Sequence, residues 1–350
     1  MTTRTFAYVG CATERSTVGF HVFDVSDPFI APQELHRIEG FVDPTMSAVH
    51  PTLPVLYSVS ETNDGELVAS SIGDDGAIQP LDRVPSGGSA PCHLSVGAAA
   101  VYVAHYGSGT IAAHRLTSDG RFAEPVRSHQ HVGNGPHPRQ DGPHAHCIVP
   151  GQDGRFVYAV DLGTDRIRRY RNAEVGESSP FEYVDELALE PGSGPRHLVF
   201  HPTAPVGFVV GELDSTVTVL ALDPDGRPVP IQTVTTLPDS FDGDSIAAEI
   251  RVHPDGRSVH VSNRGHDSIA SFRFDGSDAR LVALGHTPSG GRHPRNFAIH
   301  PTGRSMLVAA RDDDRIIHFA VDPEHGRHTP VTTIEDVVEP VSVVYVEMDR

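Results

Sequence analysis

One phrase recurs along this chain and decides its fold. It reads PTMSAVHP at Pro44–Pro51, PRHLVFHP at Pro195–Pro202 and PRNFAIHP at Pro294–Pro301, and AEIRVHPDGR at Ala248–Arg257 carries its second half. Each copy runs through apolar or alternating residues into a turn such as HPDGR or HPTGR, and a second apolar run follows the turn. Apolar runs of period two that are bounded by proline and glycine are typical of a β-hairpin.

Two further strands follow each hairpin, as in STVTVLAL and then PIQTVTTL within residues 215–237. When the residue that ends the second strand is taken as a marker, the copies are 44 to 56 residues apart. The markers are Cys11, Glu61, His105, Asp161, Glu212, Arg264 and Arg311. Seven units of four short strands, with no long amphipathic helix, predict an all-β, seven-bladed β-propeller rather than a sandwich or a βαβ array.

The two ends of the chain complete one unit. The chain begins in FAYVGC at Phe6–Cys11, which aligns with the second strands of later units, so the first unit lacks its first strand. EPVSVVYVEM at Glu339–Met348 has the first-strand pattern. We therefore expect the N- and C-terminal strands to pair in one blade, which removes open sheet edges. Residues 1–350 would then form a single seven-bladed domain.

Composition excludes several classes of protein. The 350 residues carry 27 arginines, no lysine and 46 acidic residues, for a net charge of −19. Such a charge repels phosphate backbones and anionic lipid, so we expect no nucleic-acid and no membrane partner. Without a signal peptide or a long apolar run, a cytoplasmic protein is expected, a monomer or a weak homo-oligomer. Cys11, Cys92 and Cys147 lack CxxC spacing and are expected to be reduced structural thiols.

Charged residues gather where first strands begin and second strands end, two positions that share one face of a propeller. Planar guanidinium forks bind carboxylate or phosphate, so this pattern predicts a small anionic ligand. The alternative is a set of salt bridges that only joins neighbouring blades. The residues concerned are Arg196, Arg264, Arg295, Arg311, His93, His105, His146, His197, Glu61, Asp161, Glu212 and Glu249.

A histidine-rich insertion, HQHVGNGPHPRQDGPHAHC, spans His129–Cys147. His144 and His146 would point the same way on a strand and could share a metal, but no cysteine or carboxylate spacing completes such a site. We therefore expect no metal and no cofactor. His146 is expected to act as an acid or base or to hydrogen-bond the substrate. Solvated loop positions are expected for His129, His131 and His137.

Two other motifs are expected to be turns. GSGPRH at Gly192–His197 has the glycines of a phosphate loop, but it leads into a strand and so lacks the helix N-terminus that would bind phosphate. The acidic runs at Asp312–Asp314 and Phe241–Ser245 lack the loop spacing of a calcium site. We expect the glycines to serve the turn and the acidic runs to be solvated.

The phrases QDGPHAHC, YAVDLGTDRI, GSGPRHLVFHP, AAEIRVHPDGRSVHVSNRGHDSIASF and HPRNFAIHPTGR, in this order and spacing, resemble the seven-bladed β-propeller lactonase family over essentially the whole chain. That family contains the propeller-type 6-phosphogluconolactonases and the fungal 3-carboxy-cis,cis-muconate lactonizing enzymes. The resemblance implies catalytic roles for four residues, with His144 as the alternative histidine. They are His146, Arg196, Glu212 and Arg264. Gly211 stands where the family more often has asparagine.

Lactone hydrolysis needs a base for water, positive charge at the oxyanion and an acid for the leaving alkoxide. Glu212 or His146 could be the base, and Arg196 and Arg264 suit the oxyanion. The resemblance points first to 6-phosphogluconolactone as the substrate of a carboxylic-ester hydrolase. A muconate-type cycloisomerase and a non-catalytic ligand-binding propeller are the alternatives. Residues expected to bind the substrate are His93, His144, His197, Glu61, Arg295 and Arg311, of which His197, Arg295 and Arg311 would hold the phosphate.

Overall fold

The computed structural model describes the backbone of residues 3–172, 181–322 and 326–349. In these ranges the chain forms seven four-stranded sheets and one short 3-10 helix, η1 (Arg311–Asp313). The described residues therefore confirm the predicted seven units of four strands and contain no long helix. The strands fall into two compact units: a larger one of Met1–Arg37 with His197–Arg350, and a smaller one of Ile38–Arg196. That residues 1–350 act as one domain stays a prediction.

The larger unit holds four of the sheets, apart from the end residues of β3 and β16. One sheet has the order β28 (Pro340–Asp349), β1 (Thr3–Cys11), β2 (Val18–Asp24), β3 (Gln33–Glu39). The next consists of β16 (Pro195–Phe200), β17 (Val206–Gly211), β18 (Thr216–Leu222) and β19 (Pro228–Thr235). The third sheet consists of β20 (Ile246–Val252), β21 (Ser258–Arg264), β22 (Ser268–Asp275) and β23 (Arg280–Pro288). The fourth consists of β24 (Pro294–Ile299), β25 (Ser305–Ala310), β26 (Arg315–Asp322) and β27 (Arg327–Glu335).

The smaller unit holds the other three sheets. The first contains β4 (Ser47–Val49), β5 (Val55–Ser60), β6 (Glu66–Ile72) and β7 (Ile78–Pro85). The second contains β8 (Pro91–Val96), β9 (Ala100–His105), β10 (Thr110–Leu116) and β11 (Phe122–Gln130). The third contains β12 (Ala145–Pro150), β13 (Phe156–Asp161), β14 (Arg166–Asn172) and β15 (Phe181–Ala188). All seven marker residues stand at the end of a second strand or one position beyond it.

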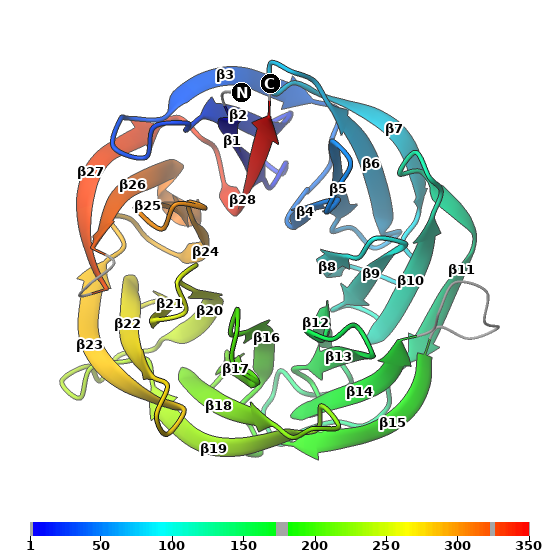
Figure 1. The fold of residues 1–350 in the computed structure, drawn as a ribbon, viewed down its shortest axis with the longest axis vertical. Helices are drawn as coiled ribbons and strands as arrows, with labels where there is room; N and C mark the ends of the chain where they lie inside the picture. The colour runs from blue at the N-terminus through cyan, green and yellow to red at the C-terminus, as the bar shows by residue number, and fades with distance from the viewer. Residues whose placement is uncertain (1–2, 173–180, 323–325, 350) are drawn as a thin grey trace. The chain divides into compact units, whose positions relative to one another are not determined.

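The two ends of the chain pair as the sequence predicted. β28 runs antiparallel to β1 from Thr3 opposite Asp349 to Gly10 opposite Ser342, and the register shifts at Gly10 and Cys11. Figure 1 shows the red β28 beside the blue β1. Backbone hydrogen bonds therefore join the first and last strands of the described chain in one sheet.

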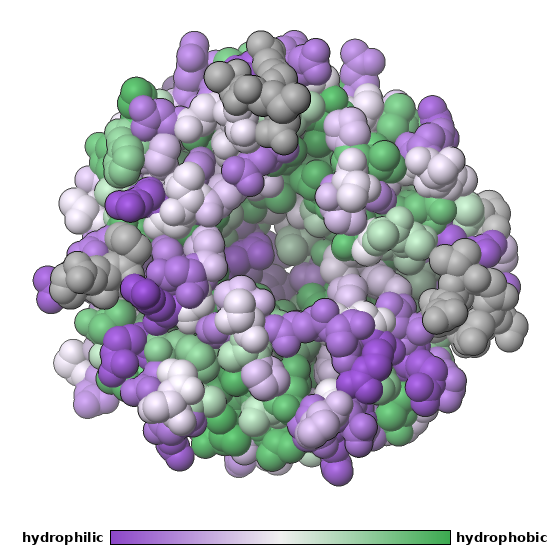
Figure 2. Space-filling model, viewed as in Figure 1, coloured by the Kyte–Doolittle hydropathy of each residue, from purple (hydrophilic) through white to green (hydrophobic). Residues whose placement is uncertain are grey.

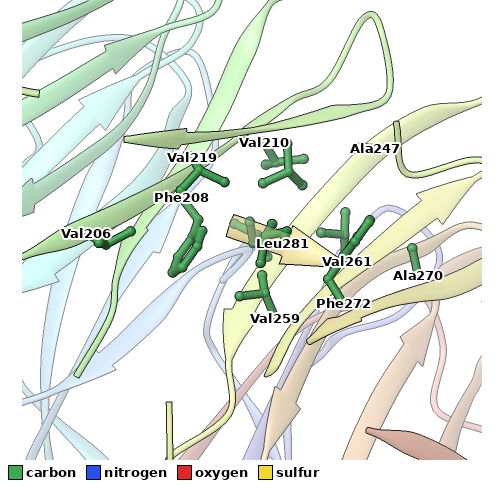
Figure 3. Packing of buried hydrophobic residues seen from close by; sticks show 12 residues of the cluster. Val206, Phe208, Val210, Val219, Ala247, Val259, Val261, Ala270, Phe272 and Leu281 are labelled. Atoms are coloured by element: carbon green, nitrogen blue, oxygen red, sulfur yellow. The ribbon is translucent and has the colours of Figure 1, made fainter. Parts of the chain in front are cut away.

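Neighbouring sheets of the larger unit pack face to face. β20 contacts β24 and β24 contacts β28, while the fourth strands β19, β23 and β27 contact one another in turn. Between the sheets of β16–β19 and β20–β23 lies a cluster of buried apolar side chains that includes Phe208, Val261 and Phe272, each at most 2% exposed (Figure 3). Burial of this cluster aligns the starts of successive first strands, and so positions the polar residues described below.

The histidine of the recurrent HP phrase joins one sheet to the next. The Nε2–H of His201 donates to the carbonyl of Gly256 at 2.9 Å, and that of His253 donates to Gly303 at 2.9 Å. His300 makes the same bond to Val25 at 3.0 Å. Three of the four phrases thus bond the following sheet, which gives the recurring histidine a structural role.

A second bond between sheets lies at the opposite end of the strands. Asp267, in the turn after β21, accepts a hydrogen bond from the amide of His293 at 2.9 Å. Asp314 accepts one from the amide of Glu339 at 2.9 Å. His293 and Glu339 directly precede the prolines that begin β24 and β28, and both have left-handed backbones with φ of 57° and 48°. The aspartates thus fix an uncommon conformation where the next sheet begins.

We predict that Gly303→Ala lowers the free energy of unfolding more than Gly154→Ala. Both glycines have left-handed φ, of +72° and +69°, so both substitutions carry a backbone cost of about 1–2 kcal/mol. A Cβ at Gly303 would lie 2.5 Å from Nε2 of His253, whereas one at Gly154 meets nothing within 4 Å. Displacing His253 should add about 1–3 kcal/mol. Urea denaturation measures both, and equal losses would show that the histidine contact contributes nothing.

Candidate active site

A buried ion pair joins Glu212 to Arg264. Glu212 directly follows β17, and Arg264 is the last residue of β21 in the neighbouring sheet. Nη2 of Arg264 lies 3.0 Å from Oε2 of Glu212, and the two side chains are only 6% and 2% exposed. The same nitrogen donates to the carbonyl of Ala247 at 2.8 Å, and the amide of Ala247 donates to the carbonyl of Glu212 at 3.2 Å. The guanidinium offsets the cost of burying the carboxylate, and the backbone bonds fix both partners.

A line of hydrogen bonds, which we term the first-strand belt, crosses four sheets of the larger unit. Nδ1 of His197 on β16 lies 3.2 Å from Oε1 of Glu249 on β20. Asn296 on β24 donates to Oε2 of Glu249, and its own Oδ1 accepts from the amide of Val343 on β28 at 3.0 Å. The amide of Ile250 also donates to Glu249, at 3.1 Å. Glu249 thereby receives bonds at both oxygens, so its charge holds the four strands in register.

Three arginines surround the loop before β24. Arg264 ends β21, Arg295 is the second residue of β24, and Arg311 begins η1. The carboxylate of Asp267, three residues after Arg264, accepts from the amide of His293 at 2.9 Å, and the amide of Arg311 donates to the carbonyl of His293 at 3.2 Å. The three guanidinium charges lie near enough to the imidazole of His293 to lower its pKa. Arg295 is half-buried, and the Arg311 side chain is 34% exposed and lies 3.7 Å from Oε1 of Glu339. Arg264 belongs both to this arginine cluster and to the Glu212 ion pair, so the acid–base candidate and the anion-binding candidates meet at one residue.

Arg196 is the second residue of β16 and is 3% exposed. It precedes His197 on the same strand, so the two side chains leave opposite faces of the sheet. His197 joins the first-strand belt, as described above. The arginine of the GPRH phrase is therefore fixed by a strand whose next residue is tied to the neighbouring sheet.

In the smaller unit, two histidines pair with two cysteines across adjacent first strands. Nδ1 of His146 on β12 lies 3.7 Å from Sγ of Cys92 on β8, and Nε2 of His93 lies 3.5 Å from Sγ of Cys147. The Cys92 thiol also faces the carbonyl oxygens of Ala104 and Ala145 at 3.7 and 3.6 Å. Carbonyl oxygens stabilise the protonated thiol, which fits the expected structural role of the cysteines. All three cysteines are free and buried.

The remaining predicted residues of the smaller unit are held by local partners. The imidazole of His144 stacks on Tyr106 with ring centres 4.4 Å apart, and its Nδ1 lies 2.7 Å from the carbonyl of Tyr106. Its Nε2 lies 3.2 Å from the exposed carboxylate of Asp141. Glu61 accepts a hydrogen bond from the hydroxyl of Thr45. His144 is therefore positioned by aromatic stacking, whereas His146 packs against a thiol.

The expectation that His131 is a solvated loop residue is wrong. Its side chain is fully buried, and its Nδ1 donates to Oδ2 of Asp161 at 2.7 Å. Arg168 contacts the same carboxylate oxygen at 2.9 Å. Burial opposes ionisation of Asp161, but the bond to His131 and the charge of Arg168 outweigh it and lower the pKa of the carboxyl. The insertion is thus anchored through an inward-facing histidine.

The glycine-rich GSGPRH phrase is a turn, as predicted. The amides of Gly192 and Gly194 both donate to the carboxylate of Asp165, at 2.8 and 2.9 Å, and both glycines have positive φ. These amides therefore bind an internal carboxylate of the smaller unit rather than offering a phosphate site.

The acidic run at Asp312–Asp314 also has internal partners. Asp313 pairs with Arg292 at 2.8 Å and Asp314 pairs with Arg15 at 2.5 Å. The run is thus paired with arginines rather than simply solvated. Across the described residues, no group of three or more histidine, cysteine or acidic side chains could hold a metal ion.

Within the larger unit, the structure thus brings together Glu212 with Arg264, His197 with Glu249, and Arg295 and Arg311 with Arg264 around His293. Sequence reasoning missed His293. The available signal was its position directly before the proline of the PRNFAIHP phrase, where Gly194 stands in PRHLVFHP. His293 replaces a turn glycine with a titratable side chain.

The seven sheets and the pairing of the terminal strands define a seven-bladed β-propeller. A model of the lactonase, 7-bladed beta-propeller family matches residues 6–345, and the chain belongs to this family. The fold class, the suspected family and the expected enzyme class, a lactonase among the carboxylic-ester hydrolases, are confirmed at that level.

Individual relatives resemble the chain over nearly its full length. It is 32% identical to the 6-phosphogluconolactonase of Bacillus subtilis, over 98% of this chain and 99% of that protein. The structure of the periplasmic gluconolactonase PpgL of Pseudomonas aeruginosa superposes with a TM-score of 0.91 at 28% identity, covering 98% of this chain and 99% of the other. A protein from Lactobacillus plantarum gives the same TM-score, identity and coverage.

Among the described residues, no helix has the length and apolar character needed to cross a membrane. One relative carries the word periplasmic in its name. The expected cytoplasmic location therefore stays a prediction.

We predict that Asn296→Asp destabilises the fold in a pH-dependent way. A protonated aspartic acid can donate to Glu249 and accept from Val343 as asparagine does, whereas an ionised one would face the Glu249 carboxylate. The new carboxyl should have a pKa raised above its unfolded value, so its stability contribution is present at low pH and lost as pH rises. Urea denaturation should show near wild-type stability at pH 4 and a loss of about 3 kcal/mol or more at pH 8. A loss that is equal at both pH values would contradict the belt.

Proposed function

We propose that this protein hydrolyses an anionic sugar-acid lactone, 6-phosphogluconolactone in particular, to the free acid. The observation that carries the proposal is that Arg264 belongs both to the buried ion pair with Glu212 and to the arginine cluster with Arg295 and Arg311. A carboxylate that can accept a proton and a group of cations that can bind an anion are thus adjacent. The small anionic substrate expected from the sequence fits this pairing. The expectation of no nucleic-acid and no membrane partner stays a prediction.

In the proposed reaction, Glu212 accepts a proton from water as the water oxygen attacks the lactone carbonyl. The ion pair with Arg264 holds the Glu212 carboxylate in place, and an ionised carboxylate is the form that can act as a base. The charges of Arg264 and Arg196 stabilise the carbonyl oxygen as it becomes an oxyanion. When the ring C–O bond breaks, the proton held by Glu212 passes to the leaving alkoxide. One water is consumed, and one hydroxy acid forms.

Arg295 and Arg311 are the proposed phosphate ligands. Both side chains are only partly buried, so their guanidinium groups can meet a ligand. The named relatives include a 6-phosphogluconolactonase and a gluconolactonase, and the lactones in these two names differ by a phosphate group. An arginine cluster supports the phosphorylated substrate, because a planar guanidinium can bind a phosphate through two parallel bonds. His197 is the third proposed ligand for the phosphate, positioned by Glu249.

For the residues of the smaller unit, only the family resemblance supports a role. We propose His146 as a further catalytic residue, with His144 as the alternative, and His93, His144 and Glu61 as substrate ligands. The thiol that packs against His146 and the aromatic ring that stacks on His144 make separate substitutions informative. His146→Asn and His144→Asn each test one assignment.

The non-catalytic alternative would need a docking surface. On the face seen in Figure 2, hydrophilic and hydrophobic side chains are interspersed. Several exposed large hydrophobic residues, such as Tyr183, Val229 and Val331, are scattered over separate fourth strands. Single exposed apolar residues are normal on soluble proteins and do not argue for a partner.

We predict that purified protein releases acid from freshly prepared 6-phosphogluconolactone, as measured with a pH-stat. Glu212→Gln and Arg196→Ala should each lower kcat by roughly 100- to 1000-fold, because each removes a charge that acts in the transition state. Arg311→Gln should raise KM for the phosphorylated lactone more than for the unphosphorylated one. The control is Asp185→Asn, which removes an ion-paired carboxylate on the fourth strand β15 and should keep wild-type rates.

Circular dichroism and urea denaturation establish that each variant is folded. A folded Glu212→Gln variant with near wild-type kcat would overturn the assignment of the base. Turnover of a muconate, followed by loss of ultraviolet absorbance, together with silence on both lactones, would favour the cycloisomerase. Silence on all three would favour a non-catalytic propeller.

A further inference from the structure

His293 is a titratable residue that the proposed mechanism does not use. It follows the turn after β23 and directly precedes Pro294, the first residue of β24. Its Nε2 atom is buried and makes no hydrogen bond to any residue that the structure describes. Its Nδ1 atom lies 3.6 Å from a carboxylate oxygen of Asp312. One ring nitrogen is thus withdrawn from water without a protein partner.

The backbone of His293 is fixed from two sides. Its amide donates to Oδ1 of Asp267 at 2.9 Å, and its carbonyl accepts from the amide of Arg311 at 3.2 Å. Its φ of 57° lies in the left-handed region, which histidine and asparagine adopt more readily than most residues. The imidazole therefore has a defined position between the end of β21 and the start of η1.

Three cations and two anions face this imidazole. Arg264 comes from β21, Arg295 from β24 and Arg311 from η1, while Asp267 comes from the turn after β21 and Asp312 from η1. Burial lowers the pKa of His293, and the charges of Arg264, Arg311 and Arg295 lower it further, to about 4, against the opposing charge of Asp267. At neutral pH the ring is uncharged because it is buried and its neighbours are cationic.

We propose that His293, Arg264, Arg295 and Arg311 form an anion-binding site. When a phosphate or carboxylate group binds there, the imidazole of His293 takes up a proton. This deepens the proposed function, on which it rests, because it assigns the anionic group of the substrate to a named cluster. The protonated ring supplies an N–H donor and a fourth positive charge only when the anion is present.

The physical reason is charge neutralisation. Burial and the repulsion of the arginines together keep His293 neutral. An anion between the arginines cancels that repulsion and adds an attraction to the imidazolium. An opposite charge within a few ångströms typically raises the pKa of such a group by roughly one to three pH units. With a rise of about two, roughly half a proton is taken up per anion at pH 6. Affinity for the anion should therefore increase as pH falls from 7 towards 5.

Sulfate is the best first probe, because it does not itself titrate between pH 5 and pH 8. Isothermal titration calorimetry in buffers of different protonation enthalpy gives the number of protons taken up per sulfate bound. We expect roughly half a proton at pH 6. In parallel, the Cε1–H resonance of His293 should report a pKa near 4 in the free protein and a higher pKa with sulfate.

Two variants identify the residue responsible. His293→Asn keeps a residue that tolerates left-handed φ, and it should still bind sulfate, more weakly, with no proton uptake at this site. Arg311→Gln removes one of the three cations and should raise the pKa of His293 in the free protein. The matched control is His266→Asn, because burial and His286, not arginines, lower the pKa of His266. It should leave the uptake unchanged.

Sulfate binding without proton uptake, no sulfate binding, or uptake that persists in His293→Asn would each overturn the proposal. The wild-type measurement alone decides the first two outcomes, even if a variant fails to fold. Because none of these readouts needs turnover, they are separate from the test of lactone hydrolysis. Proton-coupled sulfate binding in a protein that hydrolyses no lactone would uphold the anion site and reject only the proposed reaction.

Discussion

The candidate site of the larger unit depends on one hydrogen bond, from the amide of His293 to the carboxylate of Asp267. This bond joins the turn of one sheet to the residue that begins the next, and its geometry recurs between Asp314 and Glu339. A residue with positive φ before a proline is uncommon, and it persists only where its surroundings determine it. In one of the two cases this residue is His293. The bond that aligns two sheets therefore also places a titratable imidazole among arginines.

The first-strand belt and the arginine cluster differ in how their charged groups are paired. Glu249 accepts bonds at both oxygens from His197, Asn296 and a backbone amide, so its charge is fully compensated within the protein. Such a carboxylate positions its neighbours. Glu212 instead pairs with the guanidinium of Arg264, whose charge also acts on His293. The two buried glutamates are chemically alike, and their neighbours favour a structural role for Glu249 and the proposed catalytic role for Glu212.

Much of the fold could be predicted because the repeat is encoded locally. Period-two apolar runs, the HP turns and the spacing of about 50 residues gave the seven sheets, and the FAYVGC phrase gave the pairing of β1 with β28. The same register placed Glu212 and Arg264 at strand ends, where the structure has them. The HP phrase itself was read as a turn, yet each of its histidines in the larger unit also bonds the following sheet.

The partners of the site residues could not be predicted, because they depend on contacts between sheets. Period and spacing show which face of a strand a residue occupies, but not the rotamer that carries Asn296 to Glu249 or the turn that buries His131 against Asp161. The position of a loop side chain depends on the backbone conformation of the loop. Positive φ at a non-glycine residue such as His293 is not recognisable from the composition of the loop. The histidine-rich insertion drew attention by its density, whereas the histidine with the most unusual charge environment stands alone in its loop.

The net charge of −19 is compatible with the proposed anion-binding site. Many acidic residues of the larger unit lie close to arginines, and Asp312, Asp313 and Asp314 pair with or face Arg311, Arg292 and Arg15. An acidic surface repels small anions at long range, but salt screens that repulsion within about 10 Å at 0.1 M. Inside that distance, the charges of the guanidinium groups determine whether an anion binds. In the proposed site, capture of an anionic ligand is a short-range event that depends on the geometry of Arg264, Arg295 and Arg311. The cationic form of His293 would form only once the anion is in place.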